Sequence, residues 1–385
     1  MSQRIFLIAA ESSGDALGAD LARALKERDS TLAIAGVGGR LMAEAGIASA
    51  ADVSGLAVLG YIDGLLAYAR VKRAVAATVK AALAAKPDVV VLIDSWGFTL
   101  RVAKALRQAA PAIKLVKYVG PQVWASRPGR AATLARAVDH LICIHDFEIP
   151  YYTPHGLGCT VCGHPALGRY KPGDGAAFRA RQGFKPSDRV LLILPGSRPS
   201  EIRRIGATLW RAAEELAKTR PELRLVVVAA HAVRKAVVAQ APALARIVDE
   251  REKEDAFAGA TVAFAASGTV TTEAALQGAP LVIGYRLGWI TWALARAFLF
   301  KSRFATLMNV AAGAEVAPEF IQTRFTVKNL VRAAAPLLDD ADLREEQVRR
   351  QDEALALMGR GGRPAAEIAA EAVLKTMAEA RSKNA

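Results

Sequence analysis

Short apolar runs alternate with amphipathic stretches along the first half of the chain. An apolar run at 5–8 is followed by a helical pattern at 16–28, and a second run at 89–93 is followed by one at 100–108. Wholly apolar strands separated by helices are typical of a parallel sheet that is covered on both faces. We therefore predict an α/β fold. Two more strands of this sheet are predicted at 115–119 and 141–144.

The same alternation resumes in the second half. Apolar runs at 190–194, 225–230, 262–265 and 280–285 predict a second parallel sheet. The Gly/Pro-rich stretch at 165–186 predicts a linker, and the residues from about 342 onward predict helices. A chain of 385 residues also exceeds the roughly 250–300 residues at which a single core stops growing.

This pattern predicts two Rossmann-like domains that face each other across a cleft. The first would span 1–168 and the second 169–345, and the helices at 346–385 could pack back on the first. In open parallel sheets, ligands bind at the carboxyl ends of the strands. Each turn directly after a strand is therefore a candidate site.

The composition favours an anionic partner. Lys and Arg number 51 against 37 Asp and Glu, which gives a formal net charge of +14. Such a surplus suits nucleic acid, an anionic membrane surface or a phosphorylated substrate. Only 6% of residues are aromatic and no nucleic-acid-binding motif is apparent, so we expect no nucleic acid partner.

The sequence predicts neither export, nor a membrane span, nor a metal centre. Residues 1–10 indicate a first strand, and the longest apolar stretch, 287–295, is far shorter than the ~20 residues that span a bilayer. Cys143, Cys159 and Cys162 argue against a disulfide framework. Because a lone CxxC is weak support for a metal site, we expect buried thiols and no metal. We also expect no cofactor and a cytoplasmic protein.

One turn in the second half is suited to a phosphate. Gly196, Ser197 and Arg198 follow the first strand of that half, and Glu201 begins the next helix. Glycine lets the backbone approach an oxyanion, and arginine offers a fork of donors. An ordinary capped turn with solvated charges is an equally good interpretation.

A second turn repeats this arrangement two strands later. Ser267, Gly268 and Thr269 end a strand and begin a helix, whose amides and dipole would favour a diphosphate. Glu273, one turn into that helix, could accept hydrogen bonds from ribose hydroxyls or could be an ordinary helix-start carboxylate. Two such turns in one domain predict a nucleotide site.

Polar residues also follow the opening strand of the first half. They are Glu11, Ser13, Gly14 and Asp15. Neither G-x-G-x-x-G nor the Walker A pattern is present, which disfavours a dinucleotide-binding protein and a nucleotide hydrolase.

Later strands of the first half add three candidates. Asp94 ends the apolar strand at 89–93, where it would be either a general base or the cap of the next helix. Trp124 and His164 follow subsequent strands. His164 could contact a nucleotide, although a lone histidine before proline is more often a turn residue.

The stretch at 285–304 interleaves aromatic and basic side chains. Trp289 and Trp292 lie close in sequence to Arg286 and Arg296, for example. This mixture suits the interface of an anionic membrane. A helix packed in the core or in a subunit contact is the alternative.

Taken together, these segments resemble lipid-A-disaccharide synthase, a family of GT-B glycosyltransferases. The matching segments are 10–15, 121–124, 163–164, 195–198 with Glu201, 266–269 with Glu273, and 284–286. The resemblance implies a metal-independent, inverting transfer of 2,3-diacylglucosamine from UDP to 2,3-diacylglucosamine 1-phosphate. The product would be the β-1,6-linked disaccharide of lipid A, made for lipopolysaccharide at the cytoplasmic face of the inner membrane.

The resemblance also implies roles for individual residues. Arg198 and the two turns would stabilise the departing diphosphate. Arg286 lies in a signature segment that we expect to bind substrate, and Asn309 matches a family position near the nucleotide.

The sequence departs from the family where the base is expected. Gly97 stands in place of the second aspartate of Ile-Asp-x-Pro-Asp-Phe, the family's proposed base. Ser126 and Gly168 are further departures. We therefore expect Asp94, or another nearby carboxylate, to take the base role.

Several alternatives stay open. The chain could be a divergent paralogue that uses another acceptor or binds without turnover, or a UDP-sugar 2-epimerase of the same fold. A non-catalytic scaffold at the membrane surface is a third alternative. The protein could also act as a homodimer.

Overall fold

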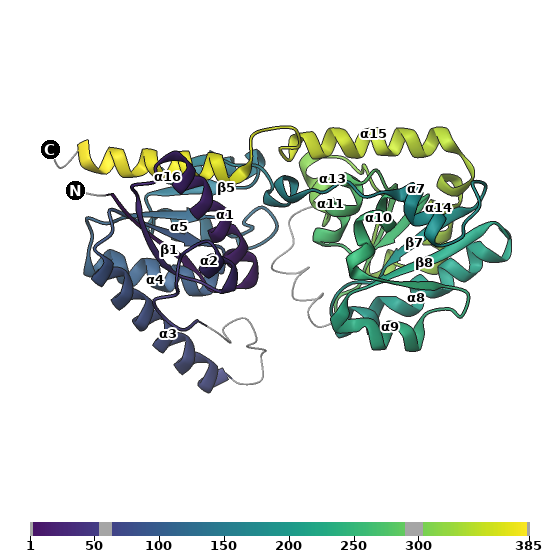
Figure 1. The fold of residues 1–385 in the computed structure, drawn as a ribbon, viewed down its shortest axis with the longest axis horizontal. Helices are drawn as coiled ribbons and strands as arrows, with labels where there is room; N and C mark the ends of the chain where they lie inside the picture. Colours follow the sequence, from purple (N-terminus) through teal and green to yellow (C-terminus); the bar gives the residue numbers. More distant parts are fainter. Residues whose placement is uncertain (1–2, 54–63, 289–302, 383–385) are drawn as a thin grey trace. The chain divides into compact units, whose positions relative to one another are not determined.

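The chain forms two compact units. We describe a computed structural model that covers residues 3–53, 64–288 and 303–382. The first unit comprises Met1–Gly168 together with Gly361–Ala385, and the second comprises Arg169–Arg360 (Figure 1). The boundary expected at 345 therefore falls inside the last helix of the second unit, α15 (Ala341–Leu357).

The first unit is built on a six-stranded parallel sheet. Its strands are β1 (Arg4–Ala9), β2 (Ala33–Val37), β3 (Val89–Ile93), β4 (Lys114–Tyr118), β5 (His140–Cys143) and β6 (Gly158–Val161). They lie in the order β2-β1-β3-β4-β5-β6. The order reverses between β1 and β3, and such a switch point opens a crevice at the carboxyl ends of the strands.

Alternate residues of each strand enter two different hydrophobic cores. Ile5 and Leu7 pack with α1 (Ser12–Arg28), α2 (Arg40–Glu44) and α16 (Ala365–Ser382). Phe6 and Ile8 pack on the other face with α3 (Gly64–Ala85), α4 (Trp96–Ala109) and α5 (Arg130–Ala135). Short α6 (Ile149–Tyr152) follows β5. Figure 1 shows α16, from the far end of the sequence, beside α1.

The second unit contains another six-stranded parallel sheet. Its strands are β7 (Arg189–Leu194), β8 (Leu223–Ala229), β9 (Arg246–Asp249), β10 (Val262–Ala265), β11 (Leu281–Tyr285) and β12 (Glu319–Ile321). Their order is β12-β11-β10-β7-β8-β9, which is the Rossmann arrangement. Its switch point lies between β7 and β10.

Helices cover this second sheet as well. One core joins the sheet to α8 (Pro199–Lys218), α9 (Arg234–Gln240) and α14 (Val327–Asp339). The remaining helices of the unit are α7 (Gly175–Arg181), α10 (Lys253–Ala258), α11 (Thr269–Leu276), α13 (Leu307–Ala312) and α15. α15 is tied to the sheet through Gln347, whose Nε2 donates to the Leu281 carbonyl at 2.7 Å.

The predicted strands are confirmed, but four others were missed. β6, β9 and β12 have only three or four residues, and each contains a polar one, so they lack the apolar run on which the prediction depended. The apolar run of β2 was overlooked. The stretch at 165–186 is also more ordered than a linker, because it contains α7. Phe178 of α7 is fully buried, and α7 contacts α10.

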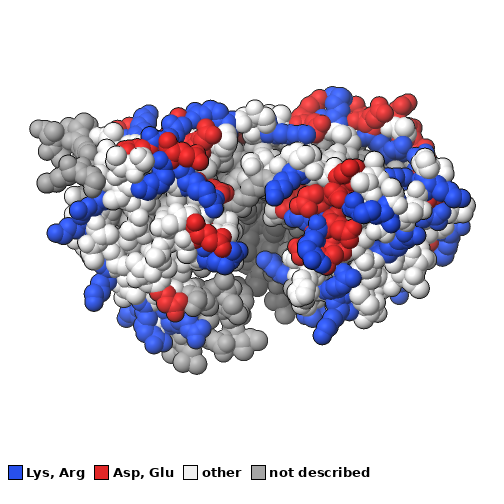
Figure 2. All heavy atoms as spheres, in the orientation of Figure 1, with Lys and Arg blue, Asp and Glu red and all other residues white. Residues whose placement is uncertain are grey.

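Charged side chains are spread over the visible surface. On the face in Figure 2, blue Lys and Arg side chains are scattered over both units and interspersed with groups of acidic ones. Within the described ranges, no helix is both long and apolar enough to cross a bilayer. The aromatic and basic residues at 289–302 lie outside those ranges.

Candidate active site

Two carboxylates are held at the switch point of the first sheet. β1 and β3 are neighbours there, with Ala9 paired to Ile93. Just beyond these strands, the Ser13 Oγ donates to the Asp94 Oδ2 at 2.7 Å, and the Ser95 Oγ donates to the Glu11 Oε1 at 2.8 Å. Gly14 lies against the same turn, since a Cβ on it would be 3.6 Å from the Asp94 Cβ.

The main chain at this edge adopts left-handed conformations. Asp94 and Ser95 have φ angles of 47° and 41°, and Val119, just after β4, has φ 66°. A β-branched residue in this region is a genuine outlier, and such strain clusters at functional sites. Both residues find side-chain partners on the β1 turn, Asp94 in Ser13 and Ser95 in Glu11.

Lys117 on β4 was not predicted as a site residue. Its side chain is only 2% exposed, and its Nζ donates to the Asp94 carbonyl and to the Thr99 Oγ1. Burial lowers the pKa of Lys117 to about 7, against the opposing charges of Asp94 and Glu11. Lysine is almost never fully buried unless paired. Its position in the predicted strand at 115–119 could therefore have drawn attention to it.

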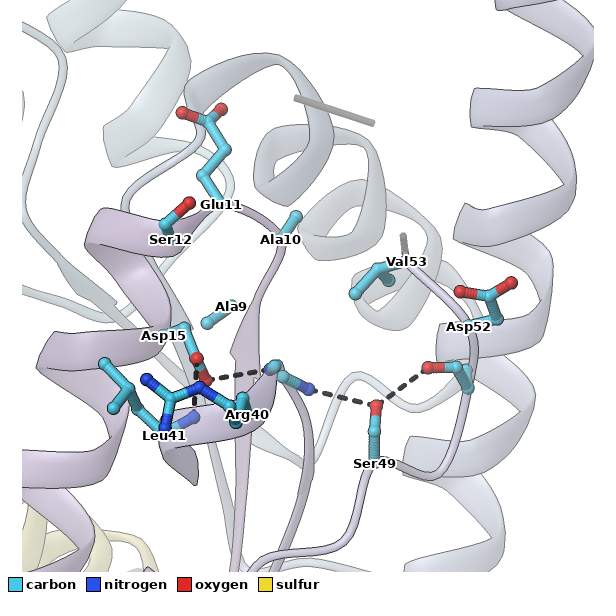
Figure 3. A pocket seen from close by; sticks show the side chains of 13 residues that line it. Ala9, Ala10, Glu11, Ser12, Asp15, Arg40, Leu41, Ser49, Asp52 and Val53 are labelled. Atoms are coloured by element: carbon cyan, nitrogen blue, oxygen red, sulfur yellow. Dashed lines mark hydrogen bonds between the residues drawn. The ribbon is translucent and has the colours of Figure 1, made fainter. Parts of the chain in front are cut away.

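A cavity of about 660 Å³ opens beside Glu11 (Figure 3). Asp15 lines the same cavity, but its carboxylate points toward the α2 turn and accepts from the amides of Gly39 at 2.8 Å, Leu41 at 2.9 Å and Met42 at 3.1 Å. These bonds fix the cavity wall. The structure therefore gives Asp15 a structural role, whereas the carboxylates of Glu11 and Asp52, which also line the cavity, are exposed.

An aromatic cluster lies after β4, β5 and β6. The rings of Trp124 and Phe147 meet edge to face at 5.5 Å, and His145 stacks on Phe147 at 4.8 Å. His164 lies 5.8 Å from His145, and burial lowers its pKa to about 4, so it is neutral near pH 7. The sequence predicts Trp124 and His164 as site residues and places 140–148 near the same edge, but the contacts of His145 and Phe147 depend on strand order.

The second candidate region is a cavity of about 370 Å³ at the switch point of the second sheet. Ser267, Gly268 and Thr269 line it where β10 ends and α11 begins. Gly268, at the N-cap with φ 159°, provides no side-chain cap. The first amides of α11 therefore suit an anion.

The turn after β7 lines the same cavity in a different way. The Glu201 Oε2 accepts from the amides of Ser197 at 3.0 Å and Arg198 at 3.2 Å. These amides were predicted to face a phosphate, but the Glu201 carboxylate already occupies them. Gly196, with φ 99°, makes room for it, because a Cβ there would lie 2.4 Å from the Glu201 Oε2. The Arg198 side chain is 77% exposed, and its only ion pair among the described residues is a long one, with Nη1 4.0 Å from the Glu201 Oε1.

Glu273 is paired inside this cavity. Its Oε2 lies 2.9 Å from the Nζ of Lys253, a lining residue that the sequence did not single out. Burial acts to lower the pKa of Lys253, but the bond to Glu273 and the neighbouring acidic charges outweigh it, so the pKa is raised. Tyr285 also lines the cavity, and its pKa is raised by burial and by the charge of Glu201.

Two side chains that were predicted to contact substrate bond to other groups of the second unit. Arg286 donates from Nη2 to the Phe325 carbonyl at 2.8 Å and lies over the Phe325 ring. Asn309 is fully buried; its Nδ2 donates to Ala317 and Glu319, and its Oδ1 accepts from the amides of Val316 and Ala317. Both donors and both lone pairs are used. Asn309 therefore stabilises its own loop instead of offering groups to a nucleotide.

The three cysteines are free thiols. Cys162 is buried in the first core, and this burial raises its pKa to about 12, so the thiol stays protonated near pH 7. Among the residues that the structure describes, no group of three His, Cys, Asp or Glu side chains is arranged to hold a metal ion.

Sequence comparisons identify the relatives of this chain. A model of the Lipid-A-disaccharide synthetase family matches residues 5–373. The chain belongs to this family. It is 39% identical over 379 residues to the Lipid-A-disaccharide synthase of Rhodospirillum centenum, covering 97% of this chain and 94% of the relative. It is also 39% identical over 390 residues to that of Nitrobacter hamburgensis, covering 99% and 97%.

Solved structures share the architecture of this member of the lipid-A-disaccharide synthetase family. UDP-GlcNAc 2-epimerase from Neisseria meningitidis, bound to UDP-GlcNAc, aligns with a TM-score of 0.61 at 13% identity over 97% of this chain and 100% of that chain. Acinetobacter baumannii MurG aligns with a TM-score of 0.58 at 17% identity over 97% and 99%. The two sheets and these likenesses give the GT-B fold.

Gly97 is the position at which this lipid-A-disaccharide synthetase homologue lacks the expected aspartate. Gly97 lies exposed in the first turn of α4, one turn before Arg101, whose Nη1 donates to the Gly97 carbonyl. A Cβ at this position would meet only the Arg101 Nη1, at 3.6 Å. The fold therefore does not require glycine here, and an aspartate would fit.

Proposed function

We propose that this chain is an inverting glycosyltransferase that moves 2,3-diacylglucosamine from UDP to 2,3-diacylglucosamine 1-phosphate. The product is the β-1,6-linked disaccharide of lipid A. Membership of the family along 5–373 is the observation that carries this proposal. The named relatives are lipid-A-disaccharide synthases and match nearly their full length.

The second unit supplies the site for the UDP end of the donor. The amides at the start of α11 and the exposed guanidinium of Arg198 both line the 370 Å³ cavity. They would stabilise the negative charge that builds on the diphosphate as it leaves. Glu273, oriented by Lys253, would accept from ribose hydroxyls.

The first unit supplies the base for the acceptor. Asp94 would take the proton of the acceptor 6-hydroxyl as that oxygen attacks the anomeric carbon of the donor. The bond from this carbon to the diphosphate breaks, and UDP leaves with the electron pair. Glu11, bonded to Ser95 beside it, is the second carboxylate at this edge.

Incubation of the purified protein with both substrates tests the proposal. Disaccharide and UDP should form together in equal amounts. A protein that titrates with UDP but makes no product is instead a binding protein, the alternative that Gly97 favours. Release of an epimerised sugar from the donor alone would favour a 2-epimerase.

Gly97→Asp tests whether the missing aspartate matters. Because the structure has room for it, the variant should fold as the wild type does. If Asp94 has taken over the base role, the added carboxylate should change turnover less than about 3-fold. If the wild type instead lacks a base, the added carboxylate should raise turnover by at least ~100-fold.

We also propose that the protein works as a peripheral protein at the cytoplasmic face of the inner membrane. Its proposed acceptor is an acylated, anionic lipid. The net charge of +14 suits such a surface.

A further inference from the structure

Lys117 is the unusual residue of the first sheet. β4 lies between β3 and β5 and is covered on both faces, yet Lys117 places a titratable amine inside it, 2% exposed. An ion taken out of water costs several kcal/mol unless its partners compensate. The partners here are a main-chain carbonyl and a hydroxyl, not an adjacent carboxylate. Stability alone therefore does not account for the lysine.

The contacts of Lys117 converge on the strained turn. Its Nζ donates to the Asp94 carbonyl, and it donates to the Thr99 Oγ1 at 3.0 Å. The same Thr99 hydroxyl lies 2.9 Å from the Asp94 carbonyl oxygen and 3.0 Å from that of Ser95. Together, Lys117 and Thr99 thus hold both left-handed residues through their main-chain carbonyls.

The same turn carries one carboxylate, Asp94, and bonds the other, Glu11 of the β1 turn. Ser13 bonds the Asp94 carboxylate, and Ser95 bonds the Glu11 carboxylate, so both depend on the path of the main chain at 94–95. Asp94 and Glu11 are also the charged groups that act on Lys117. One network therefore joins β4, the β3 turn and the β1 turn.

We propose that Lys117 is a positioning residue for glycosyl transfer. By donating a hydrogen bond to the Asp94 carbonyl, it holds the Asp94 and Glu11 carboxylates in place for the acceptor. This inference rests on the proposed function. It assigns Lys117 no contact with substrate, and its effect passes through the turn at 94–95.

Lys117→Met tests the proposal, with Lys114→Met as its matched control. Both lysines lie on β4, but Lys114 is at the amino end and reaches Asp139 at 3.5 Å, away from the turn. Lys117→Met should lower kcat by about 100-fold, the cost of a misplacement near 1 Å, and leave the donor KM within about 2-fold. Lys114→Met should leave both constants within about 2-fold.

Thermal unfolding separates positioning from a purely structural role. Methionine fills the site without the cost of burying a charge, and Thr99 still satisfies the Asp94 carbonyl, so the Tm of Lys117→Met should equal or exceed that of the wild type. An unchanged kcat overturns the proposal. A loss of kcat that accompanies a lower Tm and weaker UDP binding overturns it as well.

Thr99 provides an independent pair if Lys117→Met does not fold. Thr99→Val removes the hydroxyl that Lys117 and the turn share, and should lower kcat by about 10-fold, whereas Thr99→Ser keeps the hydroxyl and should retain activity. Equal activity of the two variants overturns the proposal. If the wild type itself makes no disaccharide, the proposed function fails and this inference fails with it.

Discussion

Asp94 and Glu11 share the switch point of the first sheet, and each accepts a bond from a serine. Asp94→Asn keeps the shape and one acceptor for Ser13 but removes the basic oxygen. Loss of a general base should lower kcat by about 10²- to 10⁴-fold with little change in Tm. Initial rates and thermal unfolding measure the two effects.

Asp20→Asn is the control, since Asp20 pairs with Arg23 on the exposed side of α1. This variant should keep full activity. Undiminished turnover in Asp94→Asn would exclude Asp94 as the base and would leave Glu11 as the candidate.

Lys253 orients Glu273 in the second unit. Lys253→Met should free that carboxylate and remove a cation from the cavity, so the donor KM should rise by about 10-fold with a smaller effect on kcat. Lys218→Met, on the exposed end of α8, removes the same charge far along the helix from the cavity and should change neither constant. A donor KM that stays the same in Lys253→Met would show that the ion pair does not support donor binding.

Single residues could be predicted only where residue type and position directly after a strand together suggested a role. Asp94, Arg198 and the small residues at 267–269 were found from their positions after strands. The sequence could not predict that the side chains of Asp15, Glu201 and Asn309 accept hydrogen bonds from main-chain amides, because the folded structure decides which amides lie near them. Lys253 lies in a run of charges, from 250 to 255, that indicates a solvated surface.

At the scale of elements, Asp15 joins α1 to α2. Its carboxylate accepts three amides around the start of α2, so Asp15→Ala leaves donors without partners and should reduce stability by about 1–2 kcal/mol. Denaturant unfolding should detect this loss, and Asp20→Ala should lose much less. Equal stability of the two variants would contradict the assigned role.

The elements themselves were predictable where both faces of a strand are buried. β3 and β7 are almost wholly apolar, and such runs are apparent in the sequence. Edge strands such as β9 meet solvent and lose this pattern. Strand order could not be predicted either. The pairing of β1 with β3 brings Ser13 to Asp94, and no local sequence pattern encodes such long-range pairing.

At the scale of the whole molecule, the net charge of +14 predicts binding to anionic membranes. The protein should sediment with vesicles that contain phosphatidylglycerol, and this binding should weaken between ~0.05 M and ~0.5 M salt because the attraction is screened. Vesicles of phosphatidylcholine alone provide the control. Equal binding to both kinds of vesicle, or binding that salt does not change, would contradict an electrostatic contact.

The return of α16 to the first unit has a consequence for synthesis on the ribosome. Ala369, Val373 and Met377 fill the same core as Ile5 and Leu7, so the part of this sheet face that α1 and α2 do not cover stays open until residues 369–377 have emerged. The second unit, 169–360, is made complete before those residues appear. The part of the protein that is translated first is therefore the part that can finish folding last, and a ribosome stalled before residue 369 would leave the α16-covered part of its sheet exposed to chaperones.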